Sequence, residues 1–165
     1  SLRVTRIPER QELDPEASFV GMNIFQQQTR YYSYQLPLFA KAGVRWVRPW
    51  LHWENTWKMQ EPKPGVFDTE QLDALRRRMK EHGQKFVYIL YNFSPTLGLA
   101  STERSALNDE QMKLWQNYVK RIVAHCPEVN DWEVWNEPDG LARSQNGFSV
   151  DFYKKLLRET AGAVR

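Results

Sequence analysis

The heptapeptide KFVYILY at residues 85–91 decides the fold class, because it carries apolar side chains on both of its alternating faces. A strand with one solvent-exposed face alternates apolar and polar residues, whereas this run predicts a strand that is buried on both faces. Strands of that kind belong to parallel sheets covered by helices. We therefore expect helices before and after it in the sequence.

Amphipathic helices are predicted on both sides of this strand. The segment 69–82 has a single apolar face, and Gly83 follows it as a stop signal. Beyond the strand, Asn108 is a predicted helix N-cap, with Gln111 at the capping-box position. The apolar stripe of this second helix consists of Met112, Trp115, Val119, Ile122 and Val123.

Strand and helix patterns alternate four times along the chain, and this order predicts an α/β fold with a parallel sheet. The loops that follow the strands are long, whereas the helix-to-strand connections are short, so the strand C-terminal ends are expected to carry function. Pro37 is expected in the first turn of its helix, where a missing N–H is tolerated. The other predicted strands are residues 19–25, 44–48 and 132–136, and the other predicted helices are residues 35–41 and a final helix opened by Ser149.

Composition limits the classes of partner. The chain has 165 residues, 41% apolar and 26% charged, which suits one domain with a packed core, preceded by an N-terminal extension at residues 1–17. The net charge of +3 without a basic run argues against nucleic-acid binding, and no apolar run approaches the roughly 18 residues of a membrane span. No leader sequence is visible. The sequence does not fix the cellular location, although a secreted or periplasmic one is favoured.

Neither a metal nor a cofactor is expected. The single cysteine, Cys126, is predicted to be a buried structural thiol, and His52, His82 and His125 do not show the spacing of zinc ligands. The residues that end the first strand, 23–26, read NIFQ and lack the glycines of a phosphate-binding loop.

The octapeptide WEVWNEPD at residues 132–139 places a carboxylate where the fourth strand ends. Strand alternation puts Glu133, Trp135 and Glu137 on one face, with Glu137 at the rim where ligands of parallel sheets collect. Flanking aromatic residues are expected to desolvate this carboxyl group and raise its pKa, which would suit it to donate a proton. Asn136 offers a donor and an acceptor to a hydroxylated ligand. The alternative is a glutamate that only caps or pairs within a loop.

This octapeptide resembles the fourth-strand motif of the retaining glycoside hydrolases of clan A, which are (β/α)8 TIM barrels. The resemblance implies that Glu137 is the general acid/base and that Asn136 hydrogen-bonds the sugar hydroxyl beside the reacting carbon. The segment VRWVRPWLHWENTWKMQEPKPGVFD at residues 44–68 resembles the second strand and following loop of the same clan. It implies that Arg48 helps to organise the catalytic carboxylates.

Two further segments are most similar to family 39 of these enzymes, which includes β-xylosidases, α-L-iduronidase and exopolysaccharide hydrolases. They are FVGMN at residues 19–23 and FSPTLGLAS at residues 93–101. Together the matches span most of residues 19–140. The implied fold is a TIM barrel of which this chain contains the first four βα units, with a carbohydrate as the substrate.

Other polar and aromatic residues of the predicted loops are candidate substrate contacts. His52 is expected to hydrogen-bond substrate or a catalytic carboxylate, with a purely structural partner as the alternative. Asn92, at the end of the third strand, is a candidate ligand contact, and the sequence leaves a role without ligand contact equally open. The loop tryptophans are either sugar-stacking platforms or loop core; these are Trp50, Trp53 and Trp57.

A second carboxylate is missing from the pattern. Retaining glycosidases hold an acid/base and a nucleophile about 5–5.5 Å apart, and the resembling family places its nucleophile at the end of the seventh strand. Glu133 lies about 13 Å from Glu137 along an ideal strand, which is too far for such a pair. Glu54 and Glu61 lie in a loop, and the resemblance to the clan implies no nucleophile role for them.

Three interpretations of this half-barrel follow. The chain is part of a longer enzyme, or it pairs with a C-terminal half supplied by a second copy or a separate chain. The third interpretation is a non-catalytic carbohydrate-binding or half-barrel scaffold protein.

Overall fold

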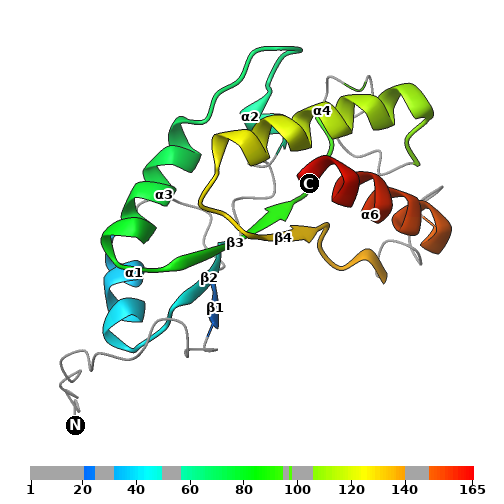
Figure 1. Cartoon of the computed structure of the whole chain (residues 1–165). Coiled ribbons are helices and arrows are strands. Elements are labelled where there is room, and N and C mark those ends of the chain that lie inside the picture. The colour runs from blue at the N-terminus through cyan, green and yellow to red at the C-terminus, as the bar shows by residue number, and fades with distance from the viewer. Residues whose placement is uncertain (1–20, 25–31, 50–56, 95–96, 98–105, 140–148) are drawn as a thin grey trace, which may run out of the picture. The chain divides into compact units, whose positions relative to one another are not determined.

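The computed structural model describes residues 21–24, 32–49, 57–94, 97, 106–139 and 149–165 (Figure 1). They form a parallel four-stranded sheet with the order β1-β2-β3-β4 and alternating helices, as the sequence predicts. The elements are β1 (Gly21–Ile24), α1 (Tyr32–Lys41), β2 (Trp46–Pro49), α2 (Trp57–Gln60), α3 (Glu70–Glu81), β3 (Lys85–Leu90), α4 (Asp109–His125), β4 (Asp131–Val134) and α6 (Val150–Val164).

The chain divides into two compact units. The first comprises residues 1–52 and 69–87, and the second comprises residues 53–68 and 88–165. The segment 53–68 therefore groups with later parts of the chain and not with its own neighbours in sequence. The boundary falls within β3, which contributes residues to both units.

In the first unit, β1, β2 and the start of β3 pair in parallel. Gly21 is opposite Trp46 and Asn23 is opposite Arg48, while Trp46 also pairs with Lys85. A Cβ atom on Gly21 would lie 3.3 Å from the Cβ of Trp46, so the pairing of these two residues leaves little room for a larger side chain at residue 21. Helices α1 and α3 contact each other, and the side-chain amide of Gln84 donates to the carbonyl of Leu36 at 3.2 Å.

Helix α1 begins three residues earlier than predicted, at Tyr32. Pro37 consequently lies inside the helix and not in its first turn, so it has no N–H to donate to the carbonyl four residues before it. Burial of Tyr32 and Leu36 explains how packing compensates for that loss. The helix ends at Lys41, and Gly43, the predicted stop signal, follows with a φ of 78°.

The predicted amphipathic helix at residues 69–82 is confirmed as α3. Thr69 precedes it at the N-cap position, and Gly83 follows with a φ of 61°. Its apolar face is buried through Leu72, Leu75 and Met79. Strand β2 differs from the prediction, because it starts at Trp46 and not at Val44.

In the second unit, the predicted capping box at the start of α4 is confirmed. The side-chain oxygen of Asn108 accepts from the N–H of Gln111 at 2.8 Å, and the Gln111 side chain accepts from the N–H of Asn108 at 3.0 Å. Ser149 caps α6 by accepting from the N–H of Phe152 at 3.1 Å. Cys126 is fully buried at the C-cap of α4, as expected for a structural thiol.

Helix α6 packs against α4 (Figure 1). The buried indole N–H of Trp115 donates to the hydroxyl of Thr160 at 2.8 Å, and that hydroxyl donates to the carbonyl of Leu156. Gln116 adds a hydrogen bond to Glu159 at 2.6 Å nearer the surface. This pairing extends the core of the second unit beyond the strands.

The long loop predicted after β2 contains the short helix α2, which the sequence did not indicate because four residues show no helical period. Gln60 of this helix donates to the hydroxyl of Tyr88 at 2.6 Å and accepts from the hydroxyl of Tyr118 at 2.8 Å. Trp57 is 1% exposed and stacks on Tyr118 with ring centroids 5.0 Å apart. Of its two predicted roles, the core role is therefore the one observed.

Candidate active site

Strand β4 ends at Val134, two residues earlier than predicted. Trp135 and Glu137 both adopt left-handed backbone conformations, with φ of 69° and 47°. The period-two alternation therefore stops at Val134, and the prediction that Glu133, Trp135 and Glu137 share one strand face is wrong. Asn136 and Glu137 lie in a turn beyond the C-terminal end of the strand.

Trp135 is 1% exposed and anchors this turn in the core of the second unit. Its ring centroid lies 4.9 Å from that of Tyr91 and 4.8 Å from that of Phe93. Its backbone N–H donates to the carbonyl of Leu90, the last residue of β3, at 2.8 Å. Trp135 therefore lies beyond the strand and not within it, in contrast to the predicted strand range of residues 132–136.

The aromatic contacts continue from this turn into the helices. Phe93 meets Trp115 of α4 edge to face, with ring centroids 5.7 Å apart. Trp115 in turn packs on Trp57 at 5.5 Å. The end of β4 is thus connected to α4 and α2 through side chains that are all buried.

Left-handed backbone gathers at the ends of two strands. Within the described ranges the non-glycine residues with positive φ are Asn92, Trp135 and Glu137, which follow β3 and β4. Asn tolerates this conformation through its short polar side chain, whereas a bulky Trp in it is uncommon. Such residues cost about 1–3 kcal/mol each and tend to cluster at functional sites.

Glu137 is exposed, and Asn136 and Asn92 are half-buried. The flanking aromatic residue on its N-terminal side, Trp135, packs into the core on Tyr91 and Phe93. The expected desolvation of the Glu137 carboxyl group by flanking aromatics is therefore not seen in the second unit. What the unit provides is an accessible carboxylate and two amides beyond neighbouring strands, which suits contact with a hydroxylated ligand.

Arg48 lies in the first unit and is half-buried on β2. Its guanidinium donates to the side-chain oxygen of Asn23 at 3.2 Å, across the register that pairs the two residues. Asn23 was not among the predicted site residues, although it belongs to the FVGMN segment. Because Asn23 lies opposite Arg48, we add it to the candidate substrate contacts at the C-terminal ends of the strands.

Some of the predicted site residues lie outside the described residues. These are His52 and Trp53, together with Trp50 and Glu54 of the same loop.

Glu61 is a structural residue, in agreement with its exclusion as a nucleophile. One carboxylate oxygen accepts from the indole N–H of Trp57 at 2.6 Å and the other accepts from the N–H of Gly65 at 2.8 Å. Its carbonyl accepts from the hydroxyl of Ser94 at 3.0 Å. Both carboxylate oxygens are thus used to fold the segment that follows α2.

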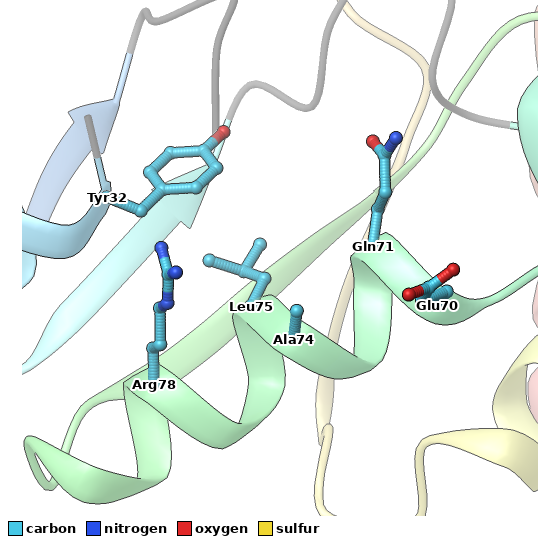
Figure 2. Close-up of a pocket in the computed structure, with 6 residues that line it drawn as sticks. All are labelled: Tyr32, Glu70, Gln71, Ala74, Leu75 and Arg78. Carbon is cyan, nitrogen blue, oxygen red and sulfur yellow. The ribbon is translucent and has the colours of Figure 1, made fainter. Parts of the chain in front are cut away.

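A separate cavity of about 260 Å³ lies in the first unit between α1 and α3 (Figure 2). Leu75 and Ala74 form its apolar part, and burial raises the pKa of Tyr32 at one side to about 12. Its remaining lining residues are Glu70, Gln71 and Arg78. None of the predicted site residues lines it, so this cavity does not coincide with the strand ends.

No cluster of three or more His, Cys, Asp or Glu side chains suited to a metal occurs among the residues that the structure describes. Within the same ranges, no helix has the length and apolar character needed to cross a bilayer.

Solved structures share this fold, although no protein-family model and no curated protein matches the sequence. A family 39 glycoside hydrolase from Bacteroides cellulosilyticus WH2 superposes with a TM-score of 0.67 and 19% identity, over 88% of this chain and 28% of that one. A family 10 xylanase from Bispora sp. MEY-1, solved with xylobiose, gives 0.62 and 14% over 88% and 47%.

Xylanase 10B from Thermotoga maritima gives a TM-score of 0.58 and 14% identity, over 87% of this chain and 46% of that one. The fold of this chain is accordingly that of the first βα units of a TIM barrel, the fold that it shares with these glycoside hydrolases. The chain spans less than half the length of each of these three proteins.

Proposed function

We propose that this chain forms the first half of a retaining glycoside hydrolase that cleaves O-glycosidic bonds in an oligo- or polysaccharide. Glu137 is the general acid/base in this proposal. Asn136, Asn92, Arg48, His52 and Trp53 are the proposed substrate contacts.

The observation that carries the proposal is the turn beyond β4. It presents an accessible carboxylate at the C-terminal end of a parallel strand, next to an amide that can bind a sugar hydroxyl. The turn has two left-handed residues, Trp135 and Glu137, and the side chain of Trp135 is buried in the core. A loop glutamate with a purely capping role would not need so constrained a backbone.

The proposed reaction has two steps. In the first, Glu137 protonates the departing glycosidic oxygen while a second carboxylate attacks the anomeric carbon and forms a glycosyl ester. In the second, the Glu137 carboxylate takes a proton from a water molecule as that water attacks the same carbon and releases the nucleophile. Retention of anomeric configuration follows from the two displacements.

The nucleophile belongs to the remaining βα units of the barrel in this proposal, supplied by the same polypeptide or by a second chain. Support comes from the lengths, because the chain covers 28% to 47% of the glycoside hydrolases with which it superposes. A carbohydrate of the xylan or cellulose type is the first substrate to try. Xylobiose is present in the family 10 xylanase structure, and cellopentaose is present in that of XacCel5A, which superposes with a TM-score of 0.55 and 18% identity.

The proposal is tested in the native gene product with aryl β-xylobiosides and β-cellobiosides. Glu137→Gln should lower kcat/KM for phenyl glycosides by about 10²- to 10⁴-fold. For 2,4-dinitrophenyl glycosides, which need little protonation, kcat/KM should fall less than about tenfold. The matched control is Asp139→Asn, which removes an exposed carboxylate two residues away and should leave both values unchanged.

Equal kcat/KM values for Glu137→Gln and the unmodified protein on phenyl glycosides would overturn the assignment. Saturable binding of xylobiose or cellobiose without hydrolysis by the native gene product would point instead to a non-catalytic carbohydrate-binding protein.

A further inference from the structure

We propose that Trp135 is a positioning residue that sets the orientation of Glu137 by joining the ends of β3 and β4. The inference rests on the proposed function, because it explains how the acid/base is held. Trp135 itself is buried, so the role proposed for it is exerted through the backbone.

A left-handed residue follows the end of each of the two strands. Asn92 comes two residues after the end of β3, and Trp135 comes directly after the end of β4. The N–H of Trp135 donates to the carbonyl of Leu90 at 2.8 Å. The two chain segments are therefore tied together by a backbone hydrogen bond at the point where both leave the strand conformation.

The indole ring makes the second connection. Tyr91 and Phe93, which flank Asn92, both contact the indole ring of Trp135. Their ring centroids lie 4.9 Å and 4.8 Å from the centroid of that ring. All three aromatic side chains are buried. Rotation of Trp135 toward an ordinary strand φ would pull its ring out of this packing, so burial of the ring favours the left-handed backbone.

Glu137 depends on that conformation because it lies two residues further on. A change of φ at Trp135 swings everything that follows it, while the strand before it stays paired. Misplacement of a catalytic group by about 1 Å can lower a rate about 100-fold. The ring of Trp135 thus acts on the carboxylate through the backbone, without touching it.

The same arrangement also relates Asn92 to the acid/base. Because Tyr91 and Phe93 both contact the Trp135 ring, the amide of Asn92 and the turn that carries Asn136 and Glu137 are fixed by one packing arrangement. Loss of the ring should therefore disturb a substrate contact and the proton donor together.

The test compares Trp135→Leu with Trp115→Leu in the native gene product. Both changes remove a buried indole of the same aromatic cluster, but Trp115 lies on α4 and not at a strand end. For Trp135→Leu we expect an approximately 100-fold loss of kcat/KM on phenyl β-xylobioside, with less than about tenfold loss on the 2,4-dinitrophenyl compound. Trp135→Phe, which keeps an aromatic ring, should restore most of the loss.

Trp115→Leu should lower thermal stability by a similar amount but leave the ratio of the two kcat/KM values unchanged. An equal fall on both substrates for Trp135→Leu, or the same change of ratio for Trp115→Leu, would overturn the positioning role.

A second measurement separates this proposal from the proposed function. The Cα and Cβ chemical shifts of Glu137 report its backbone conformation, whether or not a substrate is hydrolysed. They should move away from left-handed values in Trp135→Leu and stay in place in Trp115→Leu and Trp135→Phe. Unchanged Glu137 chemical shifts in Trp135→Leu would refute the positioning role even in an active enzyme. In contrast, a Glu137→Gln variant whose kcat/KM changes equally on phenyl and 2,4-dinitrophenyl glycosides would refute only the proposed function.

Discussion

Glu137 and Asn136 could be proposed as site residues from the sequence motif, but their backbone conformation could not be predicted from it. Strand alternation predicted a shared face for Glu133, Trp135 and Glu137, and the left-handed φ of Trp135 breaks it. A tryptophan gives no signal for that conformation. The cause is packing against Tyr91 and Phe93, which are distant in sequence, so only the folded structure reveals it.

Positive φ alone should decide the effect of alanine at Gly65. A Cβ atom added to Gly65 or to Gly162 would have no neighbouring atom within 4 Å, but only Gly65 has a positive φ, 76°. Gly65→Ala should therefore lower the free energy of unfolding by about 1 kcal/mol. Gly162→Ala, in α6, should raise it by about 0.5 kcal/mol through helix propensity. Urea denaturation checks both, and equal effects would contradict the conformational explanation.

Ionisation of Tyr32 should destabilise the protein in alkali. Burial raises the pKa of its hydroxyl to about 12, against 10.0 in the unfolded chain, so the folded state holds the proton more tightly. The stabilisation is present below pH 10 and is lost as the pH rises towards 12, by about 2–3 kcal/mol. Urea denaturation between pH 9 and pH 12 should show a shallower fall for Tyr32→Phe. The exposed Tyr34→Phe is the control, and an identical pH dependence in all three proteins would contradict the prediction.

Elements with strong local signals were predicted well, and those that depend on distant contacts were not. The capping box of α4 and the apolar face of α3 follow from short-range patterns, and both are observed. Helix α2 was missed because Gln60 is fixed by Tyr88 and Tyr118 and not by neighbours in sequence. Helix α1 begins three residues before its predicted start for a related reason. The stabilisation from burying Tyr32 outweighs the cost of placing Pro37 inside the helix.

The capping box should account for a measurable part of the stability of α4. Asn108→Ala removes the acceptor for the Gln111 N–H and should lower the free energy of unfolding by about 1 kcal/mol. Asn117→Ala changes the same residue type at an exposed position inside the same helix, where it should be neutral or slightly stabilising. Thermal unfolding of the two variants distinguishes them, and a similar loss in both would argue against the cap.

The hydroxyl group of Thr160 should contribute measurably to the contact between α4 and α6. Thr160→Val leaves the buried indole N–H of Trp115 without its acceptor and should lower the free energy of unfolding by about 1–3 kcal/mol. Thr160→Ser keeps the hydroxyl and should recover most of that loss. Chemical denaturation gives both values, and a valine variant as stable as the serine variant would show that the hydrogen bond contributes little.

At the scale of the whole molecule, the order of strands and the parallel sheet were predictable from the alternation of patterns. The division of the chain was not predictable, because the segment 53–68 groups with later residues through long-range contacts. Gln60 and Trp57 contact Tyr118 of α4, and the carbonyl of Glu61 accepts from the hydroxyl of Ser94. The superposed glycoside hydrolases share the backbone fold at 14–19% identity, although most of their side chains differ from those of this chain. The function itself depends on the site, and the same fold supports many sites.

The central claim is that Glu137 is the acid/base of a two-step mechanism, and azide tests it most directly. We predict that Glu137→Ala in the native gene product hydrolyses 2,4-dinitrophenyl β-xylobioside or β-cellobioside slowly, because the second step lacks its base. Added azide, which needs no deprotonation, should accelerate turnover and yield the glycosyl azide with retained β configuration. Undiminished hydrolysis without azide, or an azide product of inverted configuration, would contradict the account.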